Sequence, residues 1–148
     1  MSVSGGDGYA GDVAARAAWD ALRSDPAAVL IDVRTRAEWA YVGLPTLAEI
    51  GKDVLLVAWD DFASGEVIPD FVGRLAAVLD GKGVDKAAPL YFICRSGARS
   101  RRAAIAATAA GHARCFNVEL GFEGLLGPDR HRATAGSWKA EGLPWMQS

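Results

Sequence analysis

The chain has little of the residue types that build metal sites and disulfides: two cysteines and two histidines among 148 residues. A structural zinc site draws its Cys and His ligands in closely spaced pairs, and Cys94 and Cys115 lie too far apart to form one. Two cysteines without a secretory signal also give no reason to expect a structural disulfide. The sequence therefore predicts no metal and no cofactor, and it fits a reducing, cytoplasmic compartment.

The chain also lacks long apolar runs and a large excess of either charge. No apolar run approaches the roughly 20 residues that cross a bilayer, and residues 1–8 have neither the basic start nor the apolar core of a secretory signal. The formal net charge of −2 gives no reason to expect nucleic acid or an anionic membrane as a partner. We expect a flexible N-terminal leader over 1–8 and a single domain over 9–148.

What the chain does have is an alternation of strand-like and helix-like segments. Continuous apolar runs at 29–31, 54–59 and 90–93 are typical of strands buried on both faces, and 114–118 is a further strand. Helical patterns fall between these strands. The alternation predicts an α/β fold, in which a central parallel sheet of about five strands carries helices on both faces.

Capping residues indicate where the helices begin. Asp12 can cap a first helix, and Asp70 can cap a later one. Thr35 and Glu38 match a capping box at the start of a short helix. The tail, 121–148, is rich in glycine and is expected to be mostly loop.

The segment from Cys94 to Ser100 is the most informative part of the chain. It follows the buried run 90–93 and opens an alanine-rich helix over 98–110. Ligands of parallel α/β sheets bind at the carboxyl ends of the strands, which is where this cysteine falls. Amide N–H groups and nearby arginines favour the thiolate, the reactive form of cysteine. We therefore expect an ionised sulfur that is open to water and surrounded by amide hydrogens.

Arginine is concentrated beside this cysteine, although the protein as a whole is mildly acidic. A local cationic cluster in such a protein predicts a small anionic ligand rather than a polyanion. Two of these arginines fall in the loop and two on the helix that follows, where a solvated helix face is an equal alternative. The four are Arg95, Arg99, Arg101 and Arg102.

Three kinds of cysteine chemistry can be compared with this pattern. A Cys–His hydrolase needs an imidazole near the sulfur, but His112 lies beyond the far end of the helix, roughly 20 Å away at about 1.5 Å per residue. A cysteine phosphatase carries an arginine six positions after the nucleophile. Here that position is Ser100, and the arginine comes one residue early, at Arg99. Sulfur transfer needs no base, only a reactive thiolate with donors and cations for an anionic sulfur.

Two segments, 30–39 and 94–100, resemble the signature segments of rhodanese-like domains, and 120–124 and 138–145 resemble the end of single-domain bacterial members. The resemblance implies a single rhodanese-like domain that acts as a thiosulfate or related sulfurtransferase. Cys94 is then the nucleophile that forms a persulfide. The active loop that binds the anionic donor and stabilises the outer sulfur consists of Arg95, Ser96, Gly97, Ala98, Arg99 and Ser100.

The resemblance also implies the partners: a small anionic sulfur donor, and cyanide or a cellular thiol as acceptor. Two other functions stay open. One is a non-enzymatic persulfide carrier or docking module that delivers sulfur to a partner protein. The other, which Ser100 opposes, is a cysteine phosphatase or arsenate reductase on the related fold.

Two further features have two interpretations each, and a third departs from the family's usual sequence. Asp32 and Arg34 either orient the active loop or form a structural ion pair near Glu38, and the structural role is favoured. Cys115 is either a resolving thiol or core packing, and packing is favoured. Gly43-Leu44-Pro45-Thr46-Leu47-Ala48 departs from the family's usual Gly-His-Ile-Pro-Gly-Ala, so the divergent region 43–70 leaves the physiological donor and acceptor open.

Overall fold

The computed structural model describes residues 8–61, 63–129, 131–132 and 134–147. The helices are α1 (Ala15–Ser24), α2 (Arg36–Tyr41), α3 (Phe71–Gly81) and α4 (Ala98–Ala109), with a 3-10 turn at Ala48–Ile50. The strands are β1 (Gly11–Val13), β2 (Val29–Asp32), β3 (Leu44–Pro45), β4 (Leu55–Leu56), β5 (Pro89–Ile93), β6 (Arg114–Val118) and β7 (Trp145–Met146). Residues 1–7 of the expected leader lie outside the described residues.

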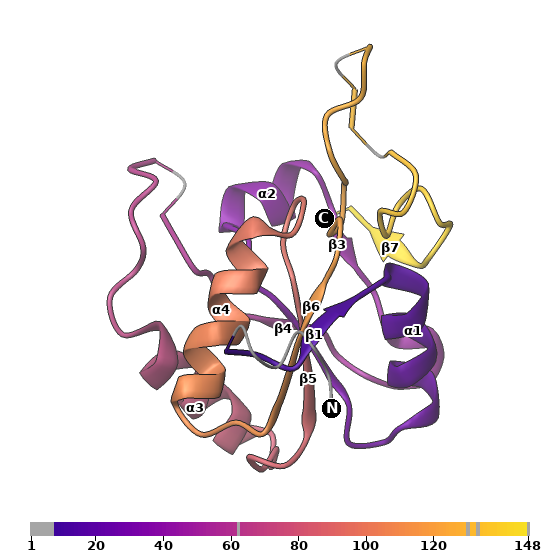
Figure 1. Ribbon diagram of the computed structural model, residues 1–148. Coiled ribbons are helices and arrows are strands. Elements are labelled where there is room, and N and C mark those ends of the chain that lie inside the picture. Colours follow the sequence, from indigo (N-terminus) through magenta and orange to yellow (C-terminus); the bar gives the residue numbers. More distant parts are fainter. Residues whose placement is uncertain (1–7, 62, 130, 133, 148) are drawn as a thin grey trace.

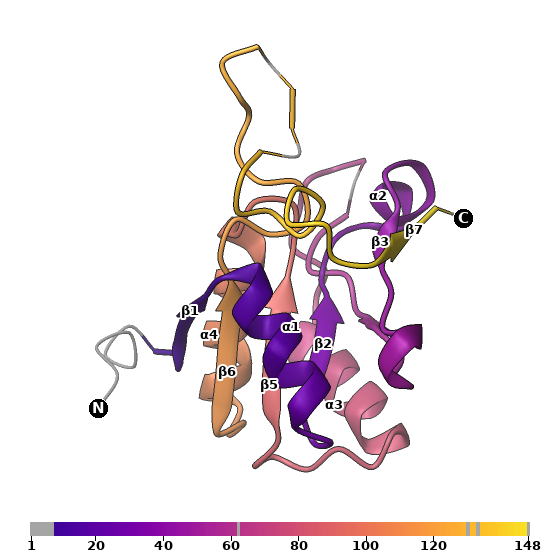
Figure 2. The same cartoon turned by 90° about the vertical axis from the view of Figure 1, so that its right-hand side faces the viewer.

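A five-stranded sheet in the order β1-β6-β5-β2-β4 forms the centre, and every neighbouring pair is parallel. Helix α1 covers one face of this sheet, and α3 and α4 cover the other (Figures 1 and 2). The carboxyl ends of the strands meet at one rim, where the chain entering α4 and the long tail also lie. The predicted fold class, a parallel sheet of about five strands with helices on both faces, is confirmed.

Side-chain alternation along β5 divides the core into two parts. Leu90 and Phe92 pack under α3 and α4, whereas Tyr91 and Ile93 pack under α1. All five residues of β5 are buried, as expected for the central strand of a parallel sheet. Because the alternation has a period of two, the residue after Ile93, Cys94, is directed to the α3 and α4 face.

The start of the first helix was predicted wrongly. Asp12 lies in strand β1, and α1 begins at Ala15 without a side-chain cap. The Asp12 carboxylate instead accepts hydrogen bonds from the Tyr9 hydroxyl and the Asn117 side-chain amide, at 2.8 and 3.0 Å. Asn117, 105 residues away in sequence, also pairs with Asp12 in the β1–β6 register at the edge of the sheet.

The other capping predictions are confirmed. The Thr35 hydroxyl accepts from the Glu38 amide, and the Glu38 carboxylate accepts from the Thr35 amide, which completes the capping box of α2. Asp70 caps α3 through the Gly73 amide.

The apolar run 54–59 forms a shorter strand than predicted. The strand β4 covers Leu55 and Leu56 at the edge of the sheet, and the Val57 and Trp59 amides continue the hydrogen bonds to the Asp32 and Val33 carbonyls. Leu56 is 42% exposed, so the strand is not buried on both faces. In the tail, β7 pairs with β3 in an antiparallel two-stranded ribbon that the sequence did not predict. No helix in the described part of the chain could cross a bilayer.

Candidate active site at the Cys94 loop

Cys94 lies between the end of β5 and the start of α4. Gly97 is the residue before α4 and has a φ of 110°, a backbone conformation that favours glycine. The Gly97 N–H donates to Cys94 Sγ at 3.1 Å. The Ser100 hydroxyl, in the first turn of α4, lies 3.1 Å from the same sulfur.

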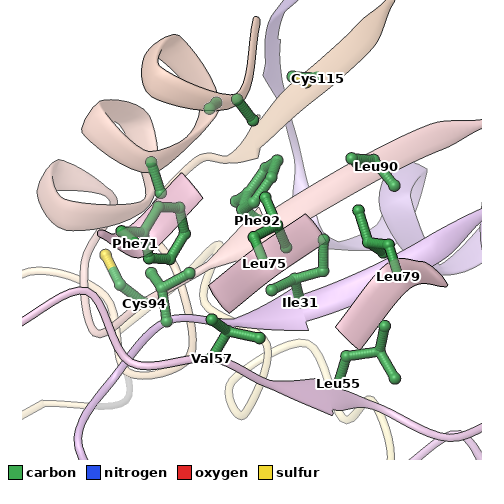
Figure 3. Packing of buried hydrophobic residues seen from close by; sticks show 14 of the residues in the cluster. Ile31, Leu55, Val57, Phe71, Leu75, Leu79, Leu90, Phe92, Cys94 and Cys115 are labelled. Carbon is green, nitrogen blue, oxygen red and sulfur yellow. The ribbon is translucent and has the colours of Figure 1, made fainter. Parts of the chain in front are cut away.

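The sulfur is buried, so the expectation of a sulfur open to water is wrong. Cys94 is 1% exposed and belongs to the apolar cluster under α3 and α4. Figure 3 shows it at one end of this cluster, beside Phe71, with Cys115 at the opposite end. The cause is the alternation of β5, which turns Cys94 to the same side as Phe92. Of the amide hydrogens expected around the sulfur, the hydrogen bonds of the described residues include one, from the Gly97 N–H.

The segment after β6 holds the Cys94 loop in place. The Phe122 amide donates to the Cys94 carbonyl at 2.8 Å, and the Glu123 and Gly124 amides donate to the Arg95 carbonyl at 2.9 and 3.1 Å. Gly121 has a φ of 55°, and a Cβ there would lie 2.7 Å from the Arg95 carbonyl oxygen. The sequence marked 120–124 only through the family resemblance, because contacts between distant segments leave no local pattern.

A pocket of about 540 Å³ lies over the loop, with Arg95, Ser96 and Ala98 in its wall. Its charged residues are of both signs. The cations are Arg95, Arg99 and Arg132, and the anions are Glu38, Asp60, Asp61 and Glu123. Asp60 and Asp61 come from the divergent region 43–70, which therefore contributes negative charge to the pocket. Carboxylates that the sequence did not predict therefore lie beside the arginines of the loop.

Arg99 is held by carboxylates. Its guanidinium binds Glu38 through two hydrogen bonds of 2.7 and 2.9 Å, and Asp60 lies 3.4 Å away. These bonds to Glu38 raise the pKa of Arg99. Burial by itself raises the pKa of Glu38, but the hydrogen bonds and charge of Arg99 and the bonds from Thr35 outweigh it and lower the pKa to about 2. Arg95, in contrast, is exposed and has its guanidinium available to a ligand.

The Glu38–Arg99 pair makes stability depend on pH. Because folding lowers the pKa of Glu38 from 4.5 to about 2, the pair stabilises the fold above pH 4.5. That contribution, roughly 3 kcal/mol from the size of the shift, is lost as the pH falls toward 2. We expect Glu38→Gln to reduce the loss of unfolding free energy between pH 4.5 and 2, as measured by urea unfolding. Asp53→Asn, in the exposed pair with Lys82, is the control, and an equal pH slope in all three proteins contradicts the prediction.

Asp32 and Arg34 form an ion pair with no solvent exposure. The Arg34 guanidinium donates to Asp32 at 2.8 Å and to the Gly43 carbonyl at 2.8 Å. It also lies over the Phe122 ring at 4.4 Å. Glu38 is not its partner, since Glu38 binds Thr35 and Arg99. The pair does not contact the sulfur, and its link to the loop runs through Phe122.

Cys115 lies far from Cys94 along the sheet. It pairs with Leu90 in the β5–β6 register, four residues before Cys94 on β5. At about 3.3 Å per residue along the strand and about 4.8 Å between strands, the two Cα atoms are roughly 14 Å apart, well beyond the separation that a disulfide spans. Burial raises the pKa of the Cys115 thiol. These observations favour packing over a resolving role.

Neither histidine lies at the site. His112 is buried between α4 and β6, at the opposite end of the sheet from Cys94, and burial lowers its pKa. His131 is exposed and binds Asp129. Within the described residues, no three His, Cys, Asp or Glu side chains cluster in a way that could hold a metal ion.

Comparisons with known proteins agree with this geometry. Residues 14–127 match the model of the rhodanese-like domain. An uncharacterized protein of Rickettsia conorii is 36% identical over 129 residues, which cover 87% of this chain and 91% of that protein. An uncharacterized protein of Rickettsia prowazekii is 34% identical over 119 residues, with coverage of 80% and 83%.

Two solved structures are similar. The crystal structure of Rv0390 from M. tuberculosis is 42% identical with a TM-score of 0.83, and the match covers 95% of this chain and 99% of that one. The polysulfide-sulfur transferase homodimer of Wolinella succinogenes is 23% identical with a TM-score of 0.57, over 93% of this chain and 78% of that one, and shares the fold. With the domain model matching most of its length, the chain belongs to the rhodanese-like domain family.

Proposed function

We propose that this protein is a sulfurtransferase that carries sulfane sulfur as a persulfide on Cys94. The donor is thiosulfate or a related small anion, and the acceptor is cyanide or a cellular thiol in the cytoplasm. The observation that carries the proposal is the contact of Cys94 Sγ with the Gly97 N–H and the Ser100 hydroxyl, both at 3.1 Å. These donors suit a sulfur anion, and the reaction needs no histidine base.

The reaction takes place in two steps. The Cys94 thiol first loses its proton to solvent, and the thiolate attacks the outer sulfur of thiosulfate. The S–S bond of thiosulfate breaks, sulfite leaves with the electron pair, and a persulfide forms on Cys94. Cyanide then attacks the outer sulfur of the persulfide, which yields thiocyanate and returns the thiolate. Because the protein alternates between two covalent forms, we expect ping-pong kinetics.

Burial of the sulfur restricts access. The loop wall formed by Arg95, Ser96 and Ala98 separates the pocket from Cys94, which is 1% exposed. The outer sulfur of a donor reaches Sγ only when this wall opens locally. The carbonyls of Cys94 and Arg95 are held by the amides of 122–124, so the opening involves the residues that follow Arg95. Small donors with a terminal sulfur, such as thiosulfate, can bring that sulfur to Sγ through a local opening of this kind.

Arg95 is the cation of this wall, and unlike Arg99 it has no acidic partner in the described structure. We expect Arg95→Ala to raise the KM for thiosulfate about tenfold, the value of one charge-assisted hydrogen bond, with a smaller effect on kcat. The measurement is a steady-state cyanide assay at low ionic strength. Arg102→Ala is the matched control, because Arg102 is also exposed but does not line this pocket. Equal KM values for the two variants contradict the assignment.

A persulfide carrier is the second candidate, and the buried sulfur favours it, since a shielded persulfide resists loss of its outer sulfur to solvent. An enzyme loads and unloads one sulfur in every cycle, and it turns over many times with thiosulfate and cyanide. A carrier loads once in a single-turnover experiment and passes its sulfur to a protein acceptor without multiple turnover. The polysulfide named for the Wolinella succinogenes protein is a related donor that belongs in the same assay.

A further inference from the structure

The Ser100 hydroxyl is shared by three acceptors. Ser100 is fully buried, and its Oγ lies 3.1 Å from Cys94 Sγ, 2.5 Å from Asn117 Oδ1 and 3.3 Å from the Gly97 carbonyl oxygen. A hydroxyl has one proton to donate. The shortest contact assigns that proton to Asn117. The lone pairs of Oγ then face the sulfur, where they accept from the Cys94 thiol.

Asp12 determines which way the Asn117 amide points. Asn117 is 4% exposed, and its Nδ2 donates to Asp12 Oδ1 at 3.0 Å. The Tyr9 hydroxyl donates to the same oxygen at 2.8 Å. Because a carboxylate only accepts hydrogen bonds, the amide presents its NH₂ to Asp12 and its oxygen to Ser100. Strand β1 brings Asp12 to this place by pairing directly with Asn117.

The Gly97 carbonyl competes with Asn117 for the Ser100 proton. A serine in the first turn of a helix readily bonds back to the carbonyl three residues earlier, and that carbonyl is 3.3 Å away. If Ser100 made this bond alone, its Oγ would be free to turn away from the sulfur. The shorter bond to Asn117 prevents this.

We propose that Asn117 is a positioning residue of the Cys94 site: its side-chain oxygen, turned toward Ser100 by Asp12, holds the Ser100 hydroxyl against the Cys94 sulfur. When Cys94 is ionised or carries sulfur, rotation about the Cβ–Oγ bond of Ser100 turns its single proton from Asn117 Oδ1 to the sulfur. Asn117 therefore positions Oγ while Cys94 is a thiol, and the bond to Asn117 breaks when the hydroxyl donates to the sulfur. The inference rests on the proposed function. It implies that the edge strand β1, which carries Asp12, helps to position the groups around the reactive sulfur.

The test measures the single-turnover rate of sulfur loading from thiosulfate by intact-protein mass spectrometry. We expect Asn117→Ala to load about tenfold more slowly, the value of one hydrogen bond to a charged group, at an unchanged half-saturating thiosulfate concentration, because Asn117 does not line the donor pocket. Asp12→Ala slows loading in the same way. Asp12→Asn recovers the rate, since both donors meet one oxygen of Asp12 and asparagine retains such an oxygen.

Two kinetic outcomes overturn the inference. One is a folded Asn117→Ala protein, with a wild-type melting curve, that loads at the wild-type rate. The other is an Asp12→Asn protein as slow as Asp12→Ala, which assigns the effect to the charge of Asp12 rather than to the orientation of the amide.

A second measurement needs no activity. In the sulfur-free protein, we expect the side-chain NH₂ resonances of Asn117 to shift in Ser100→Ala and in Asp12→Ala, but not in Cys115→Ser, a change on the same strand. Unchanged resonances in Ser100→Ala overturn the positioning role. If the parent protein loads no sulfur while these shifts occur, the proposed function fails and the positioning of Ser100 by Asn117 stands.

Discussion

Replacing Cys94 with serine is expected to abolish sulfur loading. After exposure to thiosulfate, the parent chain gains one sulfur atom by intact-protein mass spectrometry, and the Cys94→Ser chain gains none. A serine hydroxyl at this position has no neighbouring base to activate it, since neither His112 nor His131 lies at the site. We expect turnover with thiosulfate and cyanide to fall by roughly 10⁴-fold or more, as for removal of other covalent nucleophiles.

The matched control is Cys115→Ser, which changes the other thiol of the chain. Cys115 is also 1% exposed, and its Sγ lies 3.7 Å from the His112 carbonyl, which can accept from a serine hydroxyl. This variant should load one sulfur like the parent. A Cys94→Ser chain that still gains sulfur, or a Cys115→Ser chain that does not, contradicts the assignment of Cys94 as the nucleophile.

The sequence predicts the sheet well where the signal is local. The run 90–93 is apolar throughout because β5 is covered on both faces, and its strand was predicted within one residue. Thr35 and Glu38 lie three residues apart, so their reciprocal hydrogen bonds could be predicted from spacing alone. Asp12 has the same capping chemistry, but its partners, Tyr9 and Asn117, include one more than a hundred residues away. A local sequence pattern cannot predict that Asp12 binds such a distant partner and does not cap the helix.

At the site, too, the features that depend on local sequence could be predicted, and the contacts between distant segments could not. The position of Cys94 at the end of a strand and the turn at Gly97 follow from local sequence. The burial of the sulfur was in principle predictable, because the two-residue period of β5 already turned Cys94 toward the core. The ion pair between Arg99 and Glu38 could not be predicted, since 61 residues separate the two in sequence. Asn117 was likewise missed, because an asparagine inside a strand gives no functional signal.

The second large effect is expected from Asp32→Ala. Asp32 and Arg34 are both without solvent exposure, and the aspartate is the only carboxylate that the described structure places on this guanidinium. Removing one partner of a buried ion pair leaves an uncompensated charge and costs about 3–5 kcal/mol. We expect the midpoint of urea unfolding to fall accordingly. Loss of activity should follow, because Arg34 lies over Phe122, whose amide holds the Cys94 carbonyl.

Two comparisons show whether burial is the cause of this effect. Asp20→Ala breaks the pair with Arg23, whose side chains are 54% and 61% exposed, and exposed pairs contribute about 0–1 kcal/mol. The double variant Asp32→Ala, Arg34→Met removes the stranded charge along with its partner, so it should recover part of the stability that Asp32→Ala loses. If the double variant is no more stable than Asp32→Ala, the cost does not lie in the buried charge of Arg34.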